Sequence, residues 1–144
     1  AGQRRMPLLD TNGVSEPRRA APEPRVVAWL DAQPLETLFL SVVTVAELRF
    51  GVARLPAGRR RNGLIEQLES QVLPTFAGRA LNFDLAATRN YAEAMARAQA
   101  QGRAVGVADG LIAAIAAANG MAVASRHTAP FAAMGVAVVD PWAD

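Results

Sequence analysis

The stretch LLDTNGVSEPRR, residues 8–19, decides how the chain can fold, because a short apolar run there ends in a single acid, Asp10. Such a run is typical of a buried strand. The polar residues after Asp10 could form an Asx turn, and Asn-Gly is a strong hairpin signal. No alternating strand follows Gly13 to complete a hairpin. A functional role for Asp10 is therefore favoured over a turn-forming role, and both stay open.

Outward from this stretch, apolar runs alternate with helical patterns along the chain. Strands are predicted at residues 6–9, 38–41, 80–83, 121–125 and 136–140, and helices at 23–33, 44–56, 60–74, 85–101 and 106–120. This alternation predicts an α/β sandwich around a mostly parallel sheet, with ligands at the carboxyl ends of the strands. One domain is expected over residues 6–144, with residues 1–5 as a tail or expression remnant.

Three of the predicted helices carry specific sequence signals. Asp84 is expected to cap the helix that follows it, and Asn119-Gly120 to end the last one. Two of the apolar faces are expected to consist of Leu64, Ile65, Leu68 and Val72, and of Leu85, Tyr91, Met95 and Ala98.

The composition excludes several kinds of chemistry. All 15 basic residues are arginine, there is no cysteine, and His127 is the only histidine. Thiolate nucleophiles, cysteine zinc sites, P-loops and Schiff-base lysines are therefore excluded. An enzyme of this composition would use carboxylates, hydroxyls and arginine, or hard cations held by oxygen. The apolar stretches are too short to span a bilayer, so a cytoplasmic protein is expected.

Arginine is unevenly distributed, although the net charge is only +2. Five arginines and no acid lie between residues 49 and 61: Arg49, Arg54, Arg59, Arg60 and Arg61. Guanidinium groups bind phosphates in a bidentate manner, so this segment could contact nucleic acid. A solvated helix end is an equally good interpretation.

Two further acids lie where a predicted strand gives way to a helix. Thr44 to Glu47 matches a capping box, in which Glu47 reaches back to the helix start, and taken alone this structural role is favoured. Asp109 lies in the first turn of the most apolar helix, where the helix dipole favours an acid. Together with Asp10, these acids fall on one predicted edge of the sheet. Converging carboxylates raise one another's pKa unless a divalent ion lies among them.

The segments LLDTNGVSE, SVVTVAELRFG, ADGLIAAIA, ASRHTAPF and VAVVDPW occur in an order that resembles the PIN-domain ribonucleases. Within that family the chain looks most similar to VapC-type toxins of bacterial toxin–antitoxin modules, in the FitB-like branch. The resemblance extends over residues 6–142. It implies a PIN-like α/β/α sandwich and an endoribonuclease that depends on Mg²⁺ or Mn²⁺. Asp10, Glu47 and Asp109 match the family's catalytic, metal-binding acids, and Asn12 matches a polar residue beside them.

The chain departs from the family pattern at His127, where an acid or sometimes asparagine is usual. A neutral imidazole could ligate a transition metal or bond to a metal-bound water. It would also remove one negative charge and weaken a second magnesium, because magnesium prefers oxygen ligands. A loop histidine without a role is the alternative.

The resemblance implies hydrolysis of an RNA phosphodiester by water, with no protein nucleophile. Arg126, Arg49, Arg59, Arg60 and Arg61 are candidates for guiding the RNA backbone. A homodimer and a cognate antitoxin are also implied, the antitoxin covering the acidic site and binding operator DNA, so that DNA is contacted only through it. Two alternatives remain. One is a catalytically weak PIN-like module that acts mainly as a repressor with its antitoxin. The other is an unrelated α/β domain with structural acids.

Overall fold

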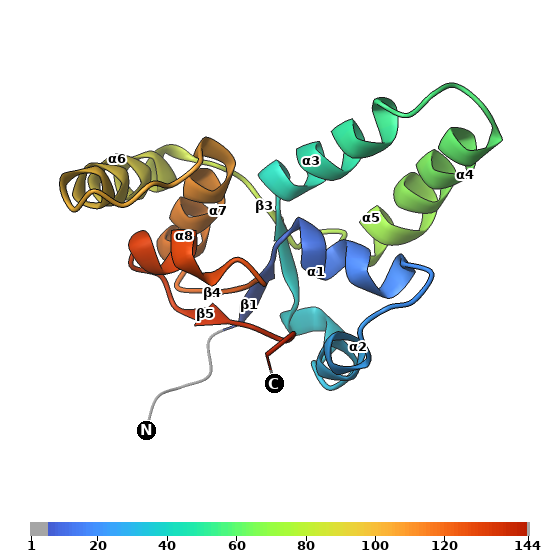
Figure 1. Ribbon diagram of the computed structural model, residues 1–144, viewed down its shortest axis with the longest axis horizontal. Helices are drawn as coiled ribbons and strands as arrows, with labels where there is room; N and C mark the ends of the chain where they lie inside the picture. Colours follow the sequence, from blue (N-terminus) through green and yellow to red (C-terminus); the bar gives the residue numbers. More distant parts are fainter. Residues whose placement is uncertain (1–5, 144) are drawn as a thin grey trace.

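A five-stranded, entirely parallel sheet forms the centre of the computed structural model, which describes residues 6–143 (Figure 1). The predicted tail at residues 1–5 lies outside the described residues. The strands are β1 (Pro7–Leu9), β2 (Phe39–Ser41), β3 (Ala80–Leu81), β4 (Ala122–Ala124) and β5 (Val138–Val139), in the order β3-β2-β1-β4-β5. Leu8 pairs with Phe39 on one side and with Val123 on the other. The first strand of the chain is therefore the central strand of the sheet.

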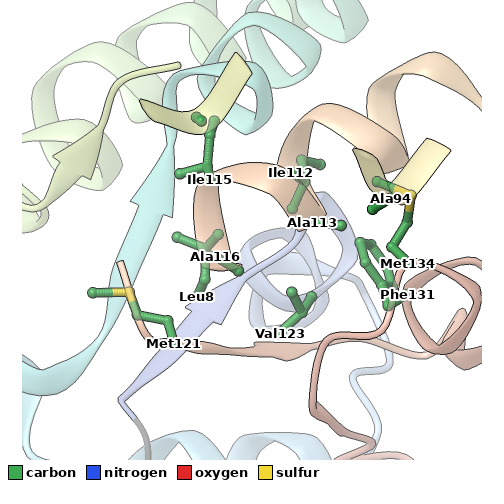
Figure 2. Packing of buried hydrophobic residues seen from close by; sticks show 11 residues of the cluster. Leu8, Ala94, Ile112, Ala113, Ile115, Ala116, Met121, Val123, Phe131 and Met134 are labelled. Carbon is green, nitrogen blue, oxygen red and sulfur yellow. The ribbon is translucent and has the colours of Figure 1, made fainter. Parts of the chain in front are cut away.

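Successive residues of the central strands point to opposite faces, and each face carries its own apolar core. On one side Leu8 and Val123 pack with α6 (Leu85–Ala100), α7 (Val107–Ala118) and α8 (Thr128–Ala133). Figure 2 shows these two side chains against Ile112, Ile115 and Ala116 of α7. Helix α7 is buried over most of its length, as its nearly uniform apolar sequence predicts.

On the other side Leu9, Leu40 and Ala124 form the second core. The helices that cover it are α1 (Thr11–Ser15), α2 (Pro24–Asp31), α3 (Val42–Ala53), α4 (Arg59–Gln67) and α5 (Leu73–Thr75). A π-helical turn, η3 (Leu68–Val72), joins α4 to α5, and two 3₁₀ turns are η1 (Glu16–Arg18) and η2 (Leu35–Thr37). Helices on both faces of a parallel sheet confirm the predicted α/β/α sandwich.

All five predicted strands and all five predicted helices are present, with small differences in their ends. Asp84 caps α6 through its side chain, which accepts from the amide of Ala87 at 3.0 Å. Asn119 ends α7, and Gly120 follows with a φ of 65°, a left-handed conformation that glycine adopts without strain. Among the described residues, no helix is long and apolar enough to cross a membrane.

Two details of the predicted apolar faces are wrong. Leu85 is 87% exposed because it is the first residue of α6, before the helix reaches the core. Ile65 is 38% exposed, whereas Leu68 and Val72 of the same predicted face are buried. Ile65 lies three positions before Leu68 and is turned farther from the buried side than Leu64, which lies four positions before Leu68 and is half-buried.

Candidate active site

Asp10 lies directly after the central strand β1 and is only 6% exposed. It caps the short helix α1, since its Oδ1 accepts from the amide of Gly13 at 2.9 Å. Its Oδ2 accepts from the Ser125 hydroxyl at 2.6 Å. Asp10 therefore forms the turn after β1 and presents a fixed carboxylate at the carboxyl edge of the sheet. The two interpretations of this acid are compatible.

Ser125 is the residue that sequence reasoning missed as the partner of Asp10. It follows β4, the neighbour of β1, and is completely buried. Its Oγ donates to Asp10 and accepts from the amide of His127 at 3.0 Å. A hydroxyl directly after a buried strand was the available signal, but only the sheet order reveals that its partner lies 115 positions earlier.

Glu47 does not cap its helix, so the capping-box interpretation is wrong. Helix α3 begins at Val42, and Ser41 caps it by accepting from the amide of Thr44 at 3.1 Å. Glu47 consequently lies in the second turn, where it is exposed. Its Oε1 accepts from the Thr11 hydroxyl at 2.7 Å, which ties α3 to α1 beside Asp10. Thr11 is a second residue that sequence reasoning did not single out.

Asp109 lies in the first turn of α7 and is half-buried. Burial raises its pKa, and the negative charge of Glu47 raises it further, whereas His127 lowers it. Burial likewise raises the pKa of Asp10, against the hydrogen bonds from Ser125 and Gly13, and the charge of Asp109 adds to this rise. Asp109 is thus electrostatically coupled to both other acids.

Asp109 interacts electrostatically with Asp10 and with Glu47, but the three carboxylates do not converge on one point. Within residues 6–143, no three histidine or acidic side chains come close enough together to hold a metal ion. Glu47 does not complete such a group, since its side chain is hydrogen-bonded to Thr11. The donor set itself consists of oxygens, which suits a hard divalent cation. His127 is exposed, and its charge lowers the pKa of both Asp10 and Asp109, so it lies beside the same site.

The expected arginine patch is only partly available to a ligand. Arg49 forms a bidentate ion pair with Glu69, at 2.8 and 3.0 Å. Arg59 and Arg60 are exposed at the start of α4, and the Nε of Arg61 is buried without a hydrogen-bond partner among the described residues. Arg126, which follows Ser125, and Asn12, in α1, are both exposed.

Comparisons with known proteins agree with this geometry. Residues 8–135 match the PIN domain family model. The chain is 54% identical over 137 residues to the VapC ribonuclease Y4jK of Sinorhizobium fredii, covering 95% of this chain and 98% of the relative. It is 50% identical over 139 residues to the toxin FitB of Neisseria gonorrhoeae, covering 96% of this chain and all of FitB.

A solved structure of FitAB bound to an IR36 DNA fragment is similar throughout, with a TM-score of 0.92 at 50% identity. The match covers 95% of this chain and 96% of the solved one. The residues that match the PIN domain family model include Asp10 after β1, Glu47 in α3 and Asp109 in α7.

Proposed function

The chain belongs to the PIN-domain family, and from this premise we propose that it is a VapC-type ribonuclease, the toxin of a toxin–antitoxin pair. The environment of Asp10 is the observation that carries the proposal. Its carboxylate is buried, both oxygens accept hydrogen bonds, and it forms no ion pair with any residue of 6–143. A buried carboxylate without a cationic partner is costly unless it binds a cation.

We propose that Asp10, Glu47 and Asp109 hold Mg²⁺ or Mn²⁺. Oxygen donors from three separate segments suit these ions. Burial is the main cause of the raised pKa of Asp109, repulsion by Glu47 adds to it, and a divalent cation would relieve that repulsion. Glu47 would turn from Thr11 toward Asp109. Because its side chain is exposed, this rotation displaces no core residue.

The bound ion would supply Lewis acidity toward an RNA phosphodiester and lower the pKa of the attacking water. The chain's own residues orient the reaction. Ser125 and the amide of Gly13 fix the two oxygens of Asp10, so the carboxylate keeps one direction. Asn12 and His127 border the site as auxiliary groups. Arg126, with the exposed Arg59 and Arg60 and the half-buried Arg61, would guide the RNA backbone, whereas Arg49 would first have to leave Glu69.

We also propose that the chain acts in the cytoplasm as a homodimer with a cognate antitoxin. The support is the high similarity to FitB and to the FitAB assembly, which has been solved on DNA. By that analogy the present chain would contact DNA only through its antitoxin.

A second candidate function is a catalytically weak binding module that acts with its antitoxin as a repressor. The observation that favours it is His127, which borders Asp10 and Asp109 where the family usually has an acid. Loss of that carboxylate lowers the negative charge available to metal.

Metal titration separates these functions. We expect the wild-type chain to bind Mg²⁺ or Mn²⁺ in a calorimetric titration, to gain thermal stability from it, and to cut a mixed RNA pool. Asp109→Asn should lose all three responses. Asp84→Asn is the matched control, because Asp84 only caps α6 and asparagine caps equally well.

Metal binding without cleavage of any RNA would favour the repressor module. If the wild-type chain bound no metal, the acidic site would be structural and the proposed ribonuclease would be wrong.

A further inference from the structure

A hollow of about 450 Å³ opens beside Asp10, and the metal site does not account for it. Its walls come from α1, η1, the segment between β4 and α8, and the last described turn of the chain. Its size falls in the range of ligand-binding pockets, about 300–1,000 Å³. The residues that matter for its chemistry are Asn12, Arg19, Arg126, His127 and Trp142.

The hollow adjoins the acids through covalent and hydrogen-bonded neighbours. Asn12 lies two positions after Asp10, and the amide of His127 donates to Ser125, which in turn donates to Asp10. His127 lines the hollow and lies close enough to Asp10 and Asp109 for its charge to act on both. A polymer whose reacting group lies at the acids would extend directly into this space.

Two guanidinium groups face the hollow. Arg126 is exposed and forms neither an ion pair nor a side-chain hydrogen bond with any residue of 6–143. Arg19 contacts Glu16 only through its Nη1, at 3.1 and 3.3 Å, which leaves its other N–H groups available to a ligand. Guanidinium groups whose N–H groups are available in this way can bind a phosphate.

A buried hydrogen bond joins two further residues that line the hollow. The indole Nε1 of Trp142 donates to Glu16 Oε1 at 3.2 Å, and both residues are less than 10% exposed. Trp142 and Arg19 both donate to Glu16, and the positive charge of Arg19 offsets the negative charge that Glu16 brings to the hollow. Because its N–H is engaged, Trp142 offers the hollow an apolar surface.

From this arrangement we infer that the hollow is the subsite for the RNA nucleotide next to the one that is cut, with Arg126 binding its phosphate and Arg19 assisting. The inference rests on the proposed ribonuclease function and deepens it. On one RNA strand, a cation held by the acids would bind the phosphate that is cut, and the two arginines would bind the neighbouring phosphate directly.

Salt-dependent RNA binding tests the subsite. Affinity for a labelled, mixed-sequence single-stranded RNA is measured by fluorescence anisotropy on the full chain carrying Asp109→Asn, so that cleavage does not interfere. Adding Arg126→Ala should weaken binding several-fold and reduce the slope of log affinity against log salt by about 0.7, the value for one phosphate contact on a single strand. Arg126→Lys should restore the slope. Arg89→Ala, which removes an exposed arginine of α6, is the matched control and should change neither quantity.

Equal behaviour of Arg126→Ala and Arg89→Ala would overturn the subsite. If the same pair of substitutions, made in the otherwise wild-type chain, also left RNA cleavage unchanged, the ribonuclease would stand and only the subsite would fall. If Arg126→Ala weakened binding of the antitoxin but not of RNA, the hollow would be a protein-binding site and the inference would be wrong. An unmodified chain that neither binds nor cuts RNA would remove both proposals.

Discussion

At the scale of single residues, Asp10 caps a helix with a carboxylate whose burial costs stability. Its carboxylate caps α1 and receives the Ser125 hydroxyl, yet burial still raises its pKa above the ordinary value of 3.8. The folded chain therefore holds the Asp10 proton more tightly than the unfolded chain does. Stability from this group is greatest at acid pH and is lost as pH rises through the raised pKa.

Asp10→Asn should consequently stabilise the metal-free chain at neutral pH, by about 1 kcal/mol. Asparagine keeps the cap through its Oδ1 and removes the buried charge, and its NH₂ group then donates to the Ser125 hydroxyl instead of accepting from it. The gain should shrink as pH falls toward 4, because wild-type Asp10 then becomes neutral as well. Thermal melting in a chelator from pH 4 to 8 measures this. A variant less stable than wild type across the whole range would show that the charge itself holds α1.

Sequence reasoning located the acids and misread one of them for a definite physical reason. Asp10 and Asp109 were correctly placed at the end of a strand and the start of a helix, because strand ends and helix starts have local signals. The capping role of Glu47 was wrong because Ser41 and Thr44 are both good caps three positions apart, and local preference does not choose between them. The contacts of Ser125 with Asp10 and of Thr11 with Glu47 join distant segments and have no local signal at all.

At the scale of elements, the packing of α6 on α7 depends on one glycine next to an acid of the site. A Cβ added to Gly110 would lie 3.0 Å from Met95 Sδ and 3.1 Å from Tyr91 Cε2. Both distances are shorter than ordinary contact. A methyl group at this position would fit only if the Met95 and Tyr91 side chains moved by a few tenths of an ångström.

Gly110→Ala should destabilise the chain by about 1–3 kcal/mol through overpacking. Gly63→Ala, in the middle of α4 with no atom within 4 Å of the added methyl, should instead stabilise by about 0.5–1 kcal/mol. Urea denaturation of both variants gives the comparison. Stabilisation by both substitutions would mean that Met95 and Tyr91 move aside easily.

The helices that the sequence predicted are the longer ones, and the strands were predicted from their apolar runs. Buried parallel strands are continuous apolar runs, and helices such as α6 and α7 extend over enough turns to display their period. Helices α1 and α8 were missed because they contain five and six residues, too few for a repeating pattern. The shift of register at the π-helical turn is likewise invisible to a fixed helical period.

At the scale of the whole molecule, Trp142 and Glu16 join two segments 126 positions apart. Burial raises the pKa of Glu16, but the hydrogen bonds from Trp142 and Arg19 outweigh it and leave the pKa below its usual value. Stability from Glu16 is therefore present at neutral pH and lost as pH falls through the lowered pKa.

Trp142→Phe should lower the melting temperature at neutral pH more than Trp29→Phe does, because Trp29 packs on the second core without bonding a buried acid. The additional loss of melting temperature in Trp142→Phe should disappear as pH falls below about 4.5, the ordinary pKa for Glu16. In a chain that already carries Glu16→Gln, the two tryptophan substitutions should lower the melting temperature by more similar amounts. An excess that persisted at acid pH would assign the effect to packing alone.

The position of β1 between β2 and β4 has a consequence for synthesis on the ribosome. Asp10 is translated early, but its partner Ser125 follows 115 residues later, and the central strand lacks one neighbour until then. At 5–20 residues per second, this interval lasts roughly 6 to 23 seconds. A nascent chain in that interval has its first acid but neither the hydroxyl that orients it nor the finished sheet. The oriented carboxylate of Asp10 can therefore form only after Ser125 has been translated and β4 has joined the sheet.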